Sequence, residues 1–100
     1  MTDATDSRKA AQERIRELTA MIERQPASDA RTKLIEECEA LGRAVAAFHM
    51  EGIRFRSYNV DRLLHSGGEG VPAGALELFG EIRKDLEAAG FHTRSHSSPG

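Results

Sequence analysis

Five side chains that could do acid–base or anion-binding chemistry recur every three or four residues in the second half of the chain. They are Glu51, Arg54, Tyr58, Asp61 and His65. At this spacing they share one side of a helix. There Asp61 can orient His65 for proton transfer, and Arg54 can hold an anion beside the glycine-rich loop at 66–70. One hypothesis is therefore a small enzyme or ligand-binding subunit that uses Asp61, His65 and this loop.

The same five side chains also make an ordinary solvated face, in which each such pair contributes only about 0.2–0.5 kcal/mol. The loop carries neither a GK[ST] nor a GxGxxG motif, and no strand pattern precedes it. A nucleophile, an oxyanion pocket and a Glu-x-x-His pair are missing from the sequence. Cys38 and His49 are eleven residues apart, about 16 Å along a helix, so they cannot share one ion. We therefore expect no enzymatic activity, no metal and no cofactor.

Three arginines make the same stretch locally basic: Arg54, Arg56 and Arg62. With Tyr58 between them, they raise the alternative of a nucleic-acid-associated regulator that contacts phosphates. Glu51 and Asp61 interrupt this strip, and the formal net charge of the whole chain is -2. Nucleic acid is therefore the less favoured partner.

The element that would position these residues is one long helix. Its apolar seam alternates spacings of four and three through Leu34, Cys38, Leu41, Val45, Phe48, Gly52, Phe55 and Asn59. This period predicts a continuous helix from Asp29 to His65, about 55 Å long. A first helix to about residue 24 ends at Pro26, with Asp6 or Ser7 as its cap, and forms a hairpin with the long helix. A third helix is expected from 72 to 89, stopped by Gly90.

A second apolar stripe begins midway along the long helix, on its far side: Ala46, Met50, Ile53, Ser57, Val60 and Leu64. A helix that is apolar on two opposite faces must be covered on both. The chain offers few covering elements, so the pattern predicts that a second copy covers this stripe. The expected interface residues are Met50, Ile53, Arg54, Tyr58, Val60, Leu64 and His65.

Gly52 leaves an alternative open, because glycine costs roughly 1 kcal/mol against alanine inside a helix. If the helix ended there, residues 53–58 would alternate as a short strand. The fold would then be α+β, with residues 91–94 able to pair with that strand.

The chain has 100 residues, 39% of them hydrophobic, which suffices for one helical domain with a modest core. Residues 1–6 and 92–100 are polar and expected to be disordered. The single cysteine, Cys38, fits a reducing compartment, and no signal-peptide pattern is seen. The longest apolar run, 44–48, is far short of the roughly 20 residues of a membrane span. A cytoplasmic protein without a membrane segment is expected.

The predicted fold is all-α: a helical hairpin with a long central helix and a third helix, dimerising into a helical bundle. The predicted function is that of a small non-enzymatic interaction protein, regulatory or scaffolding, that acts as a homodimer. The residues do not identify a partner, nor do they decide whether the second stripe meets itself or another protein.

Overall fold

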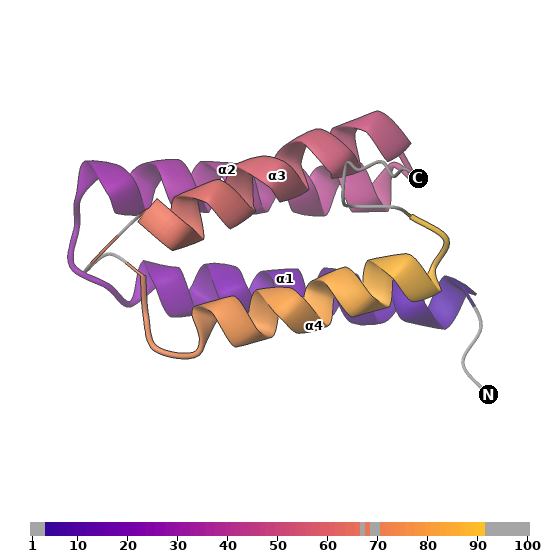
Figure 1. Cartoon of the computed structure of the whole chain (residues 1–100), viewed down its shortest axis with the longest axis horizontal. Helices are drawn as coiled ribbons and strands as arrows, with labels where there is room; N and C mark the ends of the chain where they lie inside the picture. The colour runs from indigo at the N-terminus through magenta and orange to yellow at the C-terminus, as the bar shows by residue number, and fades with distance from the viewer. Residues whose placement is uncertain (1–3, 67, 69–70, 92–100) are drawn as a thin grey trace.

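The fold is all-α, as the apolar periodicity predicts. The structure, a computed structural model, describes residues 4–66, 68 and 71–91. Its helices are α1 (Ala4–Glu23), α2 (Asp29–Ala46), α3 (Met50–Ser66) and α4 (Ala75–Ala88). They run alternately up and down, with α2 and α3 in one layer over α1 and α4 (Figure 1). The alternative of a strand at 53–58 is wrong, because that segment lies inside α3.

All four helices bury a stripe of the same spacing, four, three and four residues. The stripes are Ala11, Ile15, Leu18 and Ile22; Leu34, Cys38, Leu41 and Val45; Ile53, Ser57, Val60 and Leu64; and Ala75, Phe79, Ile82 and Leu86. This spacing keeps each stripe on one face, so that side chains interdigitate between nearly antiparallel helices. Phe91, beyond α4, completes the core.

The short connections follow the expected capping chemistry. Ser28 caps α2, its Oγ accepting the N–H of Arg31 at 3.0 Å. After α4, Gly90 adopts a φ of 100°, and the N–H of the buried Phe91 donates to the carbonyl of Leu86 at 2.8 Å. This is the Schellman arrangement that a glycine stop makes possible, and it confirms the predicted end of the third helix.

Two predicted boundaries shift. The helix expected from residue 72 begins instead at Ala75, behind Gly74 with its φ of 88°. Residues 4–6, expected to be disordered, belong to α1, which makes Ser7 a buried helical residue rather than a cap. The predictions for residues 1–3 and 92–100 lie outside the described residues.

The predicted long helix is wrong: the chain breaks between α2 and α3, where Phe48 takes a left-handed φ of 60°. The imidazole of His49 then caps α3, its Nδ1 accepting the N–H of Gly52 at 2.8 Å. The break lets α3 fold back against α2 (Figure 1). The two apolar stripes that the sequence places on one long helix thus belong to two successive helices, and the buried residues of each helix face the core.

The break removes the reason for a second copy that rested on the second stripe. Ile53, Val60 and Leu64 are 1%, 0% and 3% exposed within a single chain. They are covered by the other helices of the same bundle. These three side chains are therefore not available to a dimer interface.

Candidate interaction surface

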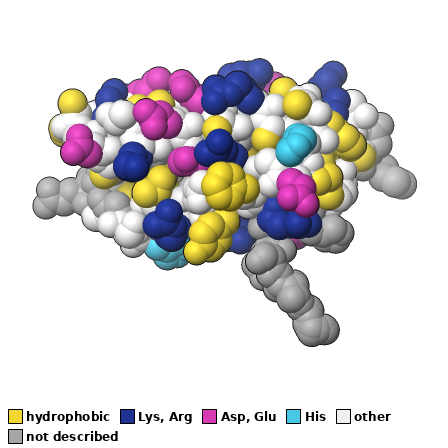
Figure 2. All heavy atoms as spheres, turned by 90° about the horizontal axis from the view of Figure 1, so that it is seen from above, with side chains coloured by type: hydrophobic (Ala, Val, Ile, Leu, Met, Phe, Trp, Pro, Cys, Tyr) yellow, Lys and Arg dark blue, Asp and Glu magenta, His cyan; other side chains and the backbone are white. Residues whose placement is uncertain are grey.

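Opposite its buried stripe, α3 carries five exposed side chains spaced four, three, four and three residues apart. This outer stripe of α3 consists of Glu51, Phe55, Tyr58, Arg62 and His65. Phe55 and Tyr58 are 56% and 59% exposed, unusually high for aromatic side chains. On the face formed by α2 and α3, hydrophobic side chains lie among lysines and arginines (Figure 2). Two neighbouring rings in a charged frame are the composition that protein interfaces favour.

Arginines lie against both rings. The guanidinium carbon of Arg62 is 6.0 Å from the ring centre of Tyr58, and that of Arg56 is 5.0 Å from the ring centre of Phe55. These are cation–π distances, so each arginine holds its ring in place while leaving one side open.

Arg56 also anchors α3 to α2. Its Nη1 lies 3.1 Å from both carboxylate oxygens of Glu37, which also accepts from Asn59 Nδ2 at 3.1 Å. Glu37 therefore neutralises Arg56, the central member of the predicted basic strip. Arg54 and Arg62 remain for a phosphate backbone, with Glu51 close by on the same surface.

The predicted pairing of Asp61 with His65 is confirmed, but its setting differs from that of a catalytic pair. His65 Nδ1 donates to the Asp61 carbonyl at 2.9 Å and lies 3.5 Å from Asp61 Oδ1. Arg83 of α4, rather than Arg54, approaches that carboxylate, at 3.4 Å. The His65 side chain is 63% exposed. The arrangement is that of a surface ion-pair network joining α3 to α4.

Two grooves among the described residues lie away from Asp61 and His65. A groove of about 570 Å³ runs between α1 and α2, and one of about 100 Å³ lies between α2 and α3. Neither is lined by Asp61 or His65. Residues 67, 69 and 70 of the glycine-rich loop lie outside the described residues. The concave site that the enzyme hypothesis requires is not found among these grooves.

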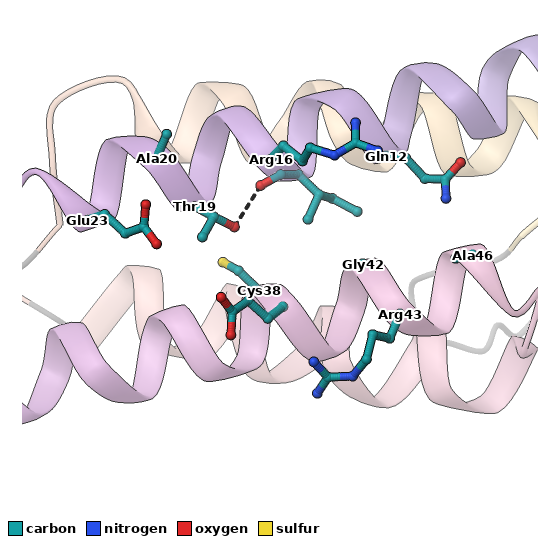
Figure 3. Close-up of a pocket in the computed structure, with 11 residues that line it drawn as sticks. Gln12, Arg16, Thr19, Ala20, Glu23, Cys38, Gly42, Arg43 and Ala46 are labelled. Atoms are coloured by element: carbon teal, nitrogen blue, oxygen red, sulfur yellow. Dashed lines mark hydrogen bonds between the residues drawn. The ribbon is translucent and has the colours of Figure 1, made fainter.

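The α1–α2 groove is lined by small residues and by the Cys38 thiol, and this thiol is not activated for reaction. Figure 3 shows Cys38 facing Thr19 across the groove, while the guanidinium groups of Arg16 and Arg43 point apart. The hydroxyl of Thr19 donates to the Ile15 carbonyl at 2.8 Å. Burial raises the pKa of the Cys38 thiol to about 12. The thiol therefore stays protonated and poorly nucleophilic, as a packed core cysteine does.

Within residues 4–66, 68 and 71–91, no group of three or more His, Cys, Asp or Glu side chains could hold a metal ion. None of the described helices is both long and apolar enough to cross a membrane.

The predicted interface residues divide into two groups. Met50, Arg54, Tyr58 and His65 are exposed, whereas Ile53, Val60 and Leu64 are buried. The prediction missed Phe55 as a surface residue, because its spacing assigned it to the first apolar seam. The useful signal was the regular spacing from Glu51 to His65, in which Phe55 and Tyr58 occupy the centre.

Comparison of the chain with protein-family models, curated proteins and solved structures gives no match.

Proposed function

We propose that this chain is a small non-enzymatic protein-interaction module, regulatory or scaffolding, whose recognition surface is the outer stripe of α3. The observation that carries the proposal is the pair Phe55 and Tyr58, which lie one helical turn apart and are each more than half exposed. The bundle buries a complete stripe on every helix and still leaves these two rings in water.

The energetics favour covering the two rings. An aromatic side chain buries about 150–250 Å² when fully enclosed, and each Å² of apolar surface contributes about 25 cal/mol. Covering the exposed halves of Phe55 and Tyr58 therefore contributes a few kcal/mol. Tyrosine and arginine are also the residue types that most often dominate binding energy at interfaces.

The surface is also pre-organised. The ion pair between Arg56 and Glu37 fixes α3 on α2, and Arg62 lies against the Tyr58 ring. Side chains held in this way lose little conformational entropy when a partner arrives, so more of the contact energy appears as affinity.

A site-specific photo-crosslink tests the proposal in the cell that makes the protein. A benzoylphenylalanine at position 55 or 58 should capture a protein, whether another chain or a second copy of this one. The same group at Lys84, which is exposed on α4, is the matched control and should capture nothing reproducibly. Absence of any specific product from both α3 positions would overturn the proposal.

Single-stranded nucleic acid is the second candidate, because exposed aromatic rings flanked by Arg54 and Arg62 can stack bases and contact phosphates. Neutralisation of Arg56 by Glu37 weakens this candidate. It predicts binding at low salt that falls steeply as salt increases and is lost in an Arg54→Ala/Arg62→Ala variant. No binding to single-stranded DNA or RNA at low salt would eliminate it.

A further inference from the structure

The outer stripe of α3 has an acidic residue at the start of the helix and basic residues near its end. Glu51 lies in the first turn, Phe55 and Tyr58 occupy the middle, and Arg62 and His65 lie in the last turns. The acidic end and the basic end are separated by about 16 Å, the rise of eleven residues. They are therefore too far apart to neutralise each other within one chain.

We infer that the partner of this stripe is a second copy of the chain, packed with its α3 antiparallel to the first. The inference rests on the proposed function, since it names the partner of the same surface. In the two-fold register centred between Phe55 and Tyr58, Phe55 faces Tyr58 of the partner subunit. Glu51 faces Arg62 of the partner subunit. The symmetry makes each pair twice.

The spacing of the stripe supports the same register. Steps of four and three are those of the a and d positions of a coiled-coil seam, with Phe55 and Arg62 on one position and Glu51 and Tyr58 on the other. Antiparallel helices pair one position with the other, which brings together opposite charges and two aromatic rings. All contacts at the centre of the seam are then complementary.

The parallel arrangement lacks this complementarity. There each residue faces its own copy, so Glu51 meets Glu51 of the partner subunit and Arg62 meets Arg62 of the partner subunit. Like charges placed opposite one another act against the pairing. The charge order of the stripe therefore specifies direction as well as partner.

The interface is small, because it consists of one 17-residue helix from each copy, about 25 Å long. It falls at the low end of specific interfaces, below about 1,200 Å². The dimer should therefore be weak and visible only as a concentration-dependent equilibrium, so that two copies can exchange.

A reciprocal charge exchange, followed by sedimentation velocity over a range of concentrations, tests the inference. Glu51→Arg or Arg62→Glu each replaces two attractive pairs by two repulsive ones and should raise the dimer Kd at least about tenfold. The double variant, with both exchanges in one chain, should regain the dimer. Glu77→Arg is the matched control, because Glu77 is likewise exposed in the first turn of its helix.

Direction is tested by mixing a Glu51→Cys chain with an Arg62→Cys chain under oxidising conditions. The antiparallel register predicts a mixed disulfide dimer and little of either homodimer, whereas homodimers alone would overturn it. A wild-type chain that stays monomeric at every concentration, or a double variant that fails to recover, also overturns the inference. Photo-crosslinking of Tyr58 to a different protein would then still support the proposed function.

Discussion

The N–H of Gly52 donates to Nδ1 of His49 across 2.8 Å, and this bond starts α3 where the chain leaves α2. A Cβ at position 52 would lie 2.8 Å from that same nitrogen and 3.3 Å from the Cβ of Ala44. Position 52 therefore requires glycine, because both the capping His49 ring and Ala44 of the preceding helix lie too close for a side chain.

Gly52→Ala should fail to stabilise the protein, although alanine is the better helix former. The added methyl group displaces the His49 ring and crowds Ala44, which offsets the propensity gain of about 1 kcal/mol. Gly80→Ala is the matched control: among the described residues, no atom outside the adjoining backbone of its own helix lies within 4 Å of its Cβ position, so it should gain about that amount. Chemical denaturation of both variants measures the difference, and an equal gain in the two would contradict the close approach.

The cap by His49 should stabilise the start of α3. Nδ1 of His49 accepts the N–H of Gly52 at 2.8 Å and so satisfies one of the amide groups left unpaired in the first turn of the helix. His49→Ala removes this acceptor and should lower the free energy of unfolding by about 1 kcal/mol, whereas His49→Asn keeps a side-chain acceptor and should change it little. Chemical denaturation compares both variants with wild type, and an equal loss in the two would refute the capping role.

Cys38 should make the protein less stable in alkali. Burial raises the pKa of its thiol from 9.0 to about 12, so the unfolded chain releases this proton at a lower pH than the folded one. The stabilisation is complete below pH 9 and is lost as the pH rises toward 12. The loss is at most about 1.4 kcal/mol per pH unit in that window. Cys38→Ala removes the thiol, and a stability curve as steep as that of wild type above pH 9 would count against the thiol.

Ser57→Ala should stabilise the protein by about 1 kcal/mol. Ser57 is 1% exposed, and its hydroxyl has no hydrogen-bond partner among the described residues. Alanine removes that unpaired group and has a higher helix propensity. Ser66→Ala, at the exposed end of the same helix, should change stability by less than about 0.5 kcal/mol. Thermal denaturation compares the two, and destabilisation by Ser57→Ala would indicate that the hydroxyl is satisfied.

Periodicity was sufficient to predict the helices and most of their core residues, because every helix repeats the same spacing of buried positions. It could not reveal the break after Ala47, since Phe48, Gly52 and Phe55 continue the spacing of the α2 stripe across it. The left-handed residue at the break is Phe48, which carries none of the usual glycine signal. The exposed face of α3 was mispredicted for the same reason: a single continuous helix placed Ile53 and Val60 on the outside and Phe55 on the inside.

The ion pair between Arg14 and Asp85 joins residues 71 positions apart, where α4 packs along α1. The neighbouring hairpins, α1 with α2 and α2 with α3, close over short connections, whereas α4 returns to α1 only after two intervening helices. Closing so long a loop has a large entropic cost before any contact compensates for it. The packing of α4 is therefore expected to be the late step of folding, and a nascent chain lacking that helix leaves the part of α1 that α4 covers exposed to the solvent.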